Sequence, residues 1–477
     1  MTKKYDIAII GAGPGGYVAA LHAAHLNKSV CLIEKSAIGG TCLNRGCIPT
    51  KAYAASRDAL LNVRLASQLG ITIPSHEVDF KEIHDRKNKI VMQTRNSVVE
   101  LLAGNGAENV RGTGRIIGAN SVEVENHRAK TKTIVEADNI IIATGSETFV
   151  VNALPVDHKR VITSGDVIRI DTLPKDIVIV GGGIIGCEFA SILSTFGVKV
   201  TIVELMDSIL CMVDKQIARI VRDRFKNDGI EMLTGVKADG VEIKDDCACL
   251  KLSDGKEIST EMILVAVGRT PNTKGIGLEE VGITTERGRI IVDDEMRTNV
   301  KNIFAIGDIT PGPMLAHKAS AEGICAVNNA AGIETKSEPF ENIPAVIFTY
   351  PEIACVGLDG KMAREKGIEV SIGRVAYDSS SKAHCMGEPE GMIKVIAKKD
   401  SGVIIGGSIC GAHAGDLIHI LSVAVKNKLQ AKDVYETIFA HPTLSELIKE
   451  AAEDVDGIAV HKIKRKTSQK KFSKRKD

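Results

Sequence analysis

The sequence predicts an α/β protein in which two similar units, each a parallel sheet flanked by helices, precede a smaller α+β domain. Three observations support this prediction. A strand, a glycine-rich turn, a helix and a second strand follow one another twice along the chain. The length of 477 residues corresponds to roughly three domains. Further strand-like and helix-like segments follow the second pattern, among them GMIKVIAKK, GVIIGGSICG and DLIHILSVAVKN.

The first unit begins close to the N-terminus, where YDIAII has the apolar pattern of a buried strand. This strand runs into a turn in which Gly11 changes the chain direction, Gly13 lets the backbone approach a pyrophosphate, and Gly16 allows close helix packing. A helix-like segment and a strand ending at Glu34 follow. Glycine-rich turns are common, but this one has its helix, whose N-terminus attracts phosphates, and its ribose-binding acid. We therefore expect a Rossmann-like dinucleotide site.

The same pattern recurs 170 residues later. The strand DIVIV precedes Gly181, Gly183 and Gly186, and the next strand ends at Glu204. A repeat with a constant offset predicts a second nucleotide site on the same chain. An acid at the end of the second strand fits an unmodified ribose 2′-OH, whereas a 2′-phosphate would need an arginine there. We therefore expect NAD rather than NADP.

Three later segments fit a protein with two nucleotide sites. IIIATGSE, ILVAVGRTPN and TNVKNIFAIGD each place a glycine at the end of an apolar strand. These glycines could simply form turns, but Asp308 follows a buried strand and is well placed to contact a flavin ribityl chain. We expect the first unit to resume after the second. The predicted domains are an FAD-binding domain of residues 1–147 and 271–345, an NAD-binding domain of 148–270, a third domain of 346–461 and a basic tail of 462–477.

Composition and charge narrow the class of protein. The content of 44% hydrophobic and 25% charged residues is that of a globular protein. The start of the chain lacks a secretory signal pattern and the longest apolar stretch is too short to span a bilayer, so we expect a cytoplasmic protein. Residues 462–477 carry nine Lys or Arg and one Asp. We interpret them as a solvated, disordered end and expect no nucleic-acid or membrane partner, although such binding is the alternative.

Eleven cysteines are scattered along the chain, which is unlike a secreted disulfide framework. Cys247 and Cys249 lack a second pair, so no metal site is expected. Among the segments that contain cysteine, only GGTCLNRGCIPTK indicates thiol chemistry. It places Cys42 and Cys47 five residues apart, directly after the first unit's second strand. In a regular helix their Cα atoms would lie more than about 7 Å apart, too far for a disulfide. A bonded pair therefore needs a bend, which Gly46 permits.

Two structural cysteines are the alternative interpretation of this segment. Thiolates carry out the chemistry of cysteine, and nearby cations or a helix N-terminus lower the pKa of a thiol. Arg45, Lys51 and a helix that we expect to begin near Ile48 or Pro49 provide these features.

The segment HPTLSE near the end of the chain supplies a candidate base. It can be interpreted as a helix start, with Thr443 as the N-cap and Glu446 three residues later completing a capping box. That interpretation does not explain His441, and histidine is the side chain best suited to proton exchange with a thiol near neutral pH. The two interpretations are compatible.

These motifs resemble those of the pyridine nucleotide-disulphide oxidoreductases, and the resemblance covers nearly the whole chain. It implies FAD and NAD as cofactors. It also implies that Cys42 exchanges with the substrate, that Cys47 lies against the flavin as the charge-transfer thiol, and that Lys51 lies near the flavin ring and pairs with Glu188. The third domain would then be a dimerisation domain.

The resemblance further implies that His441 is the acid–base catalyst, that Glu446 orients it, and that a homodimer brings this pair to the cysteines of the other subunit. The complete set of expected cofactor-binding positions is Gly11, Gly13, Gly16, Glu34, Lys51, Gly114, Thr144, Gly145, Gly181, Gly183, Gly186, Glu188, Glu204, Gly268, Arg269, Asp308 and Ala316.

The substrate needs a separate argument, because the family includes reductases of glutathione, trypanothione and mercuric ion that mostly use NADPH. HPTLSE rather than HPTSSE, MLAHKASAEG and the Glu204 position resemble members that oxidise protein-bound dihydrolipoamide with NAD. A C-terminal cysteine pair, expected of a mercuric reductase, is absent from the sequence. We expect electrons to pass from dihydrolipoamide to a Cys42–Cys47 disulfide, to FAD and to NAD. The expected partner is a lipoyl domain or lipoylated carrier protein of a 2-oxo acid dehydrogenase or glycine-cleavage complex. A flavin reductase of another disulfide is the alternative.

Overall fold

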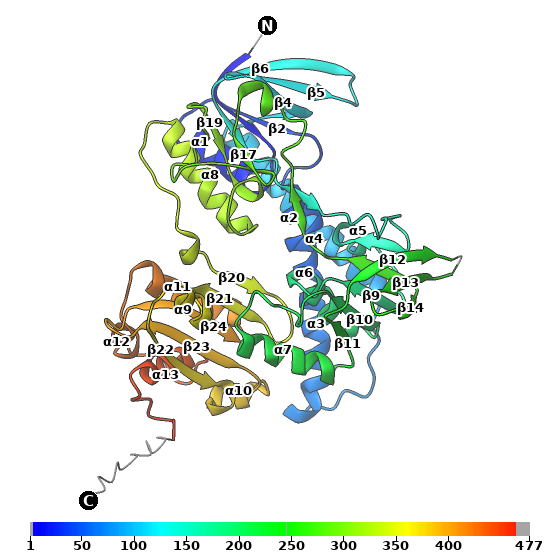
Figure 1. Ribbon diagram of the computed structural model, residues 1–477, viewed down its shortest axis with the longest axis vertical. Coiled ribbons are helices and arrows are strands. Elements are labelled where there is room, and N and C mark those ends of the chain that lie inside the picture. The colour runs from blue at the N-terminus through cyan, green and yellow to red at the C-terminus, as the bar shows by residue number, and fades with distance from the viewer. Residues whose placement is uncertain (1–2, 245, 464–477) are drawn as a thin grey trace, which may run out of the picture. The chain divides into compact units, whose positions relative to one another are not determined.

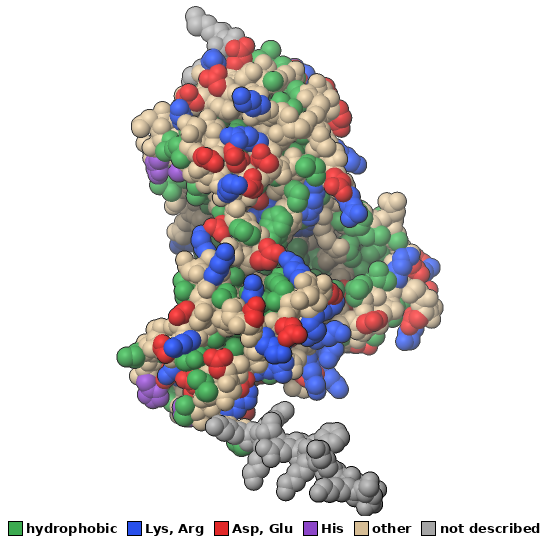
Figure 2. Space-filling view, turned by 60° about the vertical axis from the view of Figure 1, so that its left-hand side comes forward, with side chains coloured by type: hydrophobic (Ala, Val, Ile, Leu, Met, Phe, Trp, Pro, Cys, Tyr) green, Lys and Arg blue, Asp and Glu red, His purple; other side chains and the backbone are tan. Residues whose placement is uncertain are grey.

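The computed structural model describes residues 3–244 and 246–463 (Figure 1). The chain divides into unit 1, residues 1–354, and unit 2, residues 355–477. Of the predicted basic tail, residues 464–477 lie outside the described residues. Within the described part, we find no helix that combines the length and the apolar character needed to cross a bilayer. Figure 2 shows Lys and Arg side chains lying among Asp and Glu side chains, as expected of a chain with 61 basic and 60 acidic residues.

The first sheet of unit 1 is parallel in the order β3-β2-β1-β6, and β19 joins β6 in parallel from far along the chain. Both faces of its central strands are buried, which explains why they are continuous apolar runs. The antiparallel strands β5 and β4 extend it. The helices α1, α4 and α8 share a core with it. The elements are β1 (Lys3–Ile10), α1 (Pro14–His25), β2 (Val30–Glu34), α4 (Phe80–Gly104), β3 (Glu108–Arg111), β4 (Thr113–Gly118), β5 (Ser121–Asn126), β6 (Thr131–Ile142), β19 (Ile303–Ala305) and α8 (Ala316–Ala330).

The second sheet of unit 1 is parallel in the order β11-β10-β9-β15-β8. The first four strands match the order β3-β2-β1-β6, so the sequence repeat is also a repeat of topology, whereas the fifth strand β8 precedes its sheet in the chain and β19 follows its own. An antiparallel sheet of order β12-β13-β14 packs beside it. The elements are β8 (Val161–Thr163), α5 (Ser164–Val167), β9 (Asp176–Val180), α6 (Ile184–Thr195), β10 (Lys199–Glu204), α7 (Lys215–Asn227), β11 (Glu231–Thr234), β12 (Ala238–Ile243), β13 (Ala248–Leu252), β14 (Glu257–Thr260) and β15 (Met262–Val265).

Shorter elements complete unit 1. The segments on either side of the second sheet meet as an antiparallel pair, in which Thr148 lies opposite Arg269 and Ser146 opposite Pro271. These elements are α2 (Gly40–Arg45), α3 (Cys47–Leu65), η1 (Ala66–Leu69), β7 (Ser146–Thr148), β16 (Arg269–Pro271), η2 (Glu279–Val281), β17 (Thr285–Glu286), β18 (Arg289–Ile290), η3 (Gly307–Ile309), η4 (Phe340–Asn342) and β20 (Ala345–Ile347).

The sheet of unit 2 has the order β21-β24-β23-β22, with antiparallel pairing of β22 with β23 and of β23 with β24. Helix α13 lies so close to β22 that a Cβ on Gly373 would come within 1.8 Å of the carbonyl oxygen of Ala451. The predicted fold class, two Rossmann-like units followed by an α+β domain, is confirmed. The elements are β21 (Ile353–Gly357), α9 (Gly360–Glu365), β22 (Val370–Ala376), η5 (Tyr377–Ser379), α10 (Ser381–Met386), β23 (Met392–Lys398), β24 (Ile404–Cys410), α11 (Ala414–Lys426), α12 (Ala431–Tyr435) and α13 (Glu446–Val455).

Candidate active site

The two glycine-rich turns share the same hydrogen bonds at an offset of 170 residues. In the first turn, Glu34 Oε2 accepts a hydrogen bond from the backbone N–H of Ala12 at 2.8 Å. In the second, Glu204 Oε2 accepts from the N–H of Gly182 at 2.6 Å. The other oxygen of each glutamate accepts from the N–H two residues further on, at 2.7 Å in both units. Each acid is therefore held at the edge of its glycine turn, where a ribose hydroxyl would lie.

Close backbone contacts require glycine at the ends of both turns. A Cβ on Gly16 would lie 1.8 Å from the carbonyl oxygen of Gly11, and a Cβ on Gly186 would lie 1.9 Å from that of Gly181. Gly11 and Gly181 have φ values of 105° and 111°, which other residues rarely adopt. The strands and helices of both turns can approach each other this closely only because these side chains are missing.

The middle glycine of each turn faces open space instead. No atom lies within 4 Å of a Cβ built on Gly13, and the only one near Gly183 is the Cε of Met212 at 4.0 Å. Gly13 and Gly183 immediately precede α1 and α6, so the first N–H groups of each helix border that space. A helix N-terminus with an open approach is a suitable site for a phosphate. Both turns therefore fit a dinucleotide.

Asp308 lies in η3, directly after β19. Its Oδ2 accepts a hydrogen bond from the hydroxyl of Ser146, which in turn accepts from Arg269 Nε at 2.7 Å. Arg269 Nη2 also donates to the carbonyl of Ser146 at 2.6 Å. Burial lowers the pKa of Arg269, and the charge of Asp308 opposes this. Gly268, with φ 136°, precedes the arginine. Ser146 was not predicted from the sequence; its only signal was its place directly after the glycine of IIIATGSE.

The other expected positions of the first unit lie around the same strand ends. Thr144 Oγ1 donates to the carbonyl of Asn272 at 2.7 Å, and Asn272 N–H donates to the carbonyl of Gly145 at 2.8 Å. Gly114 lies in β4, where a Cβ would come within 3.0 Å of a core isoleucine. Ala316 is the first residue of α8. These contacts tie the segments before and after the second sheet to each other.

The two predicted redox cysteines lie on either side of a helix break. Cys42 belongs to α2 and Cys47 begins α3, while Gly46 between them leaves helical geometry with φ −141° and ψ −110°. Helix α3 thus begins at Cys47, one or two residues before the predicted start near Ile48 or Pro49. Both cysteines are half-buried thiols. The bend that the spacing requires is present at Gly46.

The interaction between the two thiols makes their pKa values unequal. It raises the pKa of Cys42 and lowers the pKa of Cys47 to about 7. Burial opposes the lowering at Cys47, and the positive charge of Lys51 adds to it. Cys47 is therefore the more readily ionised of the two thiols.

Lys51 lies one helical turn after Cys47 and pairs with Glu188 of α6. Its Nζ is 3.0 and 2.9 Å from the two carboxylate oxygens and lies 4.3 Å from the ring centroid of Phe348. Glu188 is buried and also accepts a hydrogen bond from the N–H of Phe348 at 2.9 Å. The structure thus connects the helix that begins at Cys47 with α6, the helix that follows the second glycine-rich turn.

The predicted His–Glu pair lies in unit 2, whereas the cysteines lie in unit 1. His441 Nδ1 is 3.1 Å from Glu446 Oε1, and the imidazole is exposed. The N–H of Thr443 donates to Glu446 Oε2 at 2.9 Å and is the main reason that the pKa of Glu446 is lowered. The glutamate is therefore ionised and fixed beside the imidazole.

The predicted N-cap at Thr443 is wrong. Helix α13 begins at Glu446 after Ser445, which already has helical dihedral angles. Thr443 Oγ1 instead donates to the carbonyl of Ala440 at 2.8 Å. Of the two hydrogen bonds of a capping box, only the one from the N–H of Thr443 to the carboxylate of Glu446 forms, because Glu446 is itself the first helical residue.

Known proteins match this chain over nearly its whole length. Residues 5–323 match the family model for pyridine nucleotide-disulphide oxidoreductase, and residues 343–452 match that of the family's dimerisation domain. The dihydrolipoyl dehydrogenase of Chlamydia pneumoniae is 38% identical over 453 residues, covering 95% of this chain and 97% of that protein. The dihydrolipoyl dehydrogenase of Geobacillus stearothermophilus is 39% identical over 461 residues, covering 96% and 97%.

Solved structures agree with these matches. LpdA from Mycobacterium tuberculosis has a TM-score of 0.90 at 28% identity and covers 95% of this chain and 100% of that one. The Cu(II) complex of the HOCl-induced flavoprotein disulfide reductase RclA from Escherichia coli has a TM-score of 0.86 at 26% identity, with coverage of 95% and 100%.

The matches confirm the predicted enzyme class and the predicted cofactors, FAD and NAD, and the dimerisation domain supports the predicted homodimer. The chain belongs to the pyridine nucleotide-disulphide oxidoreductase family.

Proposed function

We propose that this protein is a dihydrolipoyl dehydrogenase in which Cys42 and Cys47 take two electrons from a dihydrolipoyl group and pass them through FAD to NAD. The observation that carries the proposal is the position of Cys42 and Cys47 on either side of the helix break at Gly46, one helical turn before Lys51. The lowered pKa of Cys47, about 7, agrees with it. Relatives that share 38–39% of their residues with this chain over nearly its full length bear that name.

The exchange step follows from this asymmetry. In the oxidised enzyme the two sulfurs form a disulfide, and a substrate thiolate attacks Cys42 Sγ. The S–S bond breaks and leaves the electron pair on Cys47, where Lys51 and a helix N-terminus stabilise the negative charge. The second substrate thiol then displaces Cys42, so that the substrate becomes a cyclic disulfide and Cys42 becomes a thiol. FAD, when bound, supplies the ring that takes up the electron pair and passes a hydride to NAD.

We propose that His441 takes the proton of one substrate thiol, and that the proton of the other ends on Cys42, which leaves the exchange as a thiol. Glu446 accepts a hydrogen bond from the N–H of Thr443, which fixes its carboxylate. The carboxylate can therefore accept a hydrogen bond from Nδ1 of the imidazole, and Nε2 remains available for the substrate proton. The tautomer with the proton on Nδ1 is the one in which Nε2 accepts. In the homodimer, the histidine of one subunit would serve the thiols of the other.

We also propose the division of the chain into an FAD-binding domain of residues 1–147 and 271–345, an NAD-binding domain of 148–270 and a dimerisation domain of 346–461. The pairing of β7 with β16 supports it, because the chain leaves the first domain and returns to it at this pair. Glu204 supports NAD as the nucleotide, since a 2′-phosphate beside this carboxylate would be repelled.

The substrate that we propose is a lipoyl group on a carrier domain of a 2-oxo acid dehydrogenase or glycine-cleavage complex. The test compares steady-state rates with dihydrolipoamide or glutathione as the thiol, and with NAD or NADP as the acceptor. Dihydrolipoamide with NAD should be the only fast combination. Equal or faster turnover of glutathione would contradict the proposal.

Replacement of one cysteine tests the site itself. Cys47→Ser should keep its bound FAD, visible in the absorption spectrum, and lose lipoamide turnover. Cys385→Ser is a matched control, because Cys385 is an exposed thiol in α10 of unit 2, and this variant should turn over normally. Normal turnover by Cys47→Ser would remove the cysteine pair from the mechanism.

A further inference from the structure

A fully buried ion pair lies at the start of α8. Lys318 Nζ is 2.8 Å from Glu322 Oε1, and the two side chains are 1% and 6% exposed. They occupy positions i and i+4 of one helix and lie on the same side of it. Burial raises the pKa of Glu322, while the charge of Lys318 opposes the shift. The reaction described above makes no use of this pair.

Both partners of the pair bind the backbone of Gly307, the residue before Asp308. Glu322 Oε2 accepts a hydrogen bond from the N–H of Gly307 at 2.7 Å. Lys318 Nζ donates to the carbonyl of Gly307 at 3.2 Å and to the hydroxyl of Thr310 at 3.0 Å. That hydroxyl also donates to the Gly307 carbonyl at 2.7 Å. The two peptide planes on either side of Gly307 are therefore held by one ion pair.

This location matters because glycine is the residue with the greatest backbone freedom. Gly307 has φ 80°, in the left-handed region. A rotation about either of its backbone bonds would move the Cα of Asp308 and redirect its carboxylate. The hydrogen bond from Ser146 fixes only the end of that side chain. The backbone from which the side chain extends is held by Lys318 and Glu322, together with the N–H of Thr310, which donates to the Gly307 carbonyl at 3.1 Å.

A contribution to the stability of the fold does not by itself explain why an ion pair is buried here. Removing two charges from water costs free energy that their attraction offsets only in favourable geometry, and apolar residues of similar volume often stabilise a protein at least as well. The geometry that this pair imposes on Gly307 is a more specific property than the stability that it contributes.

We propose that Lys318 and Glu322 are positioning residues of the flavin site, which lock the backbone at Gly307 and thereby hold Asp308 in the orientation that binds FAD. The inference rests on the proposed role of Asp308 as a flavin ligand. The pair does not touch the reacting atoms and acts through Asp308.

The test measures the dissociation constant of FAD, from flavin fluorescence on dilution of the full-length holoenzyme. Glu322→Gln keeps the size of the side chain but leaves the Lys318 charge without its counterion, and it should weaken FAD binding about tenfold or more, the scale of one lost charge-assisted hydrogen bond. Thr310→Val removes one hydroxyl and is a milder change in case Glu322→Gln fails to fold. It should weaken FAD binding by about three- to tenfold.

A double-mutant cycle separates positioning from general loosening of the fold. If the pair acts through Asp308, Glu322→Gln or Thr310→Val should weaken FAD binding in the native background and have little further effect in the Asp308→Ala background. Full additivity, or no effect in the native background, would overturn the positioning role and leave the proposed function intact. Unchanged FAD binding by Asp308→Ala itself would instead refute the role of Asp308.

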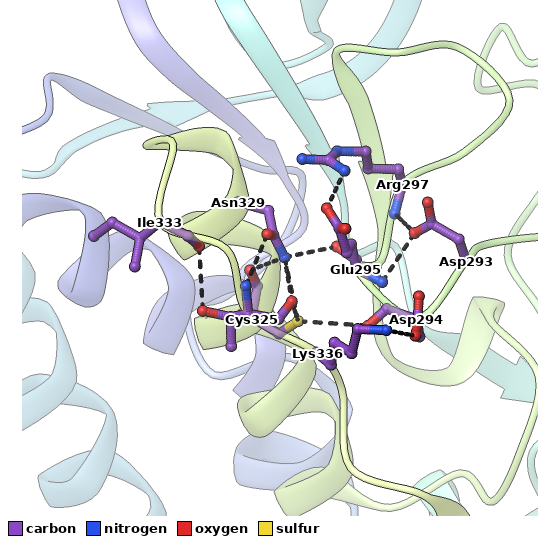
Figure 3. A network of polar contacts seen from close by, with 9 residues as sticks. Asp293, Asp294, Glu295, Arg297, Cys325, Asn329, Ile333 and Lys336 are labelled. Carbon is purple, nitrogen blue, oxygen red and sulfur yellow. Dashed lines mark hydrogen bonds and ion pairs between the residues drawn. The ribbon is translucent and has the colours of Figure 1, made fainter.

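Asn329 offers a matched control at the other end of the same helix, about 16 Å away along its axis. It is buried, and its Nδ2 donates to the carbonyls of Glu295 and Cys325 (Figure 3) at 3.1 and 3.0 Å and to that of Thr335 at 2.7 Å. Asn329→Ala should lower the melting temperature and leave the dissociation constant of FAD unchanged. An equal weakening of FAD binding by Asn329→Ala would show that any disturbance of α8 suffices and would overturn the inference.

Discussion

The thiol-to-thiolate hydrogen bond between Cys42 and Cys47 allows a quantitative prediction. Cys47 has a pKa of about 7, against 9 for an ordinary thiol, a preference for the thiolate of about 3 kcal/mol at roughly 1.4 kcal/mol per unit. A hydrogen bond to a charged group is worth about 1.5–3 kcal/mol and accounts for most of this. Cys42→Ala removes the donor, so the pKa of Cys47 should rise to about 8–9. Cys42→Ser keeps a donor and should leave it near the native value.

The assay is a pH titration of the charge-transfer absorbance between the Cys47 thiolate and FAD, in the two variants and in the two-electron-reduced native holoenzyme. The midpoint should move upward in Cys42→Ala and stay low in Cys42→Ser. An identical midpoint in all three proteins would refute the reasoning.

The same pKa difference affects the stability of the fold. Because the pKa of Cys47 is lower in the folded protein than in the unfolded chain, the stabilisation that its thiolate contributes is fully present above the unfolded pKa of about 9 and is lost as pH falls through about 7.

Three more predictions test the nucleotide sites and the base. Gly183→Ala has room for its methyl group, so this variant should melt at the native temperature but show a raised KM for NAD. In Gly186→Ala the new methyl group meets a carbonyl oxygen at 1.9 Å, so this variant should have a lower melting temperature. Equal effects of the two substitutions would contradict the separate roles assigned to the two glycines. His441→Gln should reduce kcat for dihydrolipoamide about a hundredfold or more, the scale of lost general acid–base catalysis; a change of less than tenfold would exclude that role. Glu204→Gln should narrow the preference for NAD over NADP, measured as the ratio of kcat/KM values, and an unchanged ratio would show that this carboxylate does not discriminate.

The parts of the fold that the sequence predicted are those governed by local pattern. DIVIV forms β9 with the predicted bounds, because a run of four apolar residues before a glycine turn is typical of a buried parallel strand. The repeat was visible because close backbone contacts demand glycine at Gly16 and Gly186, and few other residues can replace it.

The parts that were not predicted depend on contacts between distant segments. Lys318 and Glu322 have the spacing of an ordinary surface ion pair, and only the packing of α8 against η3 reveals that they are buried around Gly307. Ser146 gains its importance from Arg269 and Asp308, which are 123 and 162 residues away along the chain. The start of α13 was misplaced by two residues, because Thr443 has the sequence of an N-cap but its hydroxyl donates to the carbonyl of Ala440, and the N-cap is Ser445.

The central claim is that electrons pass from a dithiol through the Cys42–Cys47 pair to FAD and then to NAD. Anaerobic titration of the holoenzyme with dihydrolipoamide, followed by its visible spectrum, tests this most directly. One equivalent should produce the charge-transfer absorbance of the Cys47 thiolate, and NAD should then restore the oxidised spectrum with formation of NADH. A preparation without flavin absorbance, or a native spectral response in Cys47→Ser, would contradict the account.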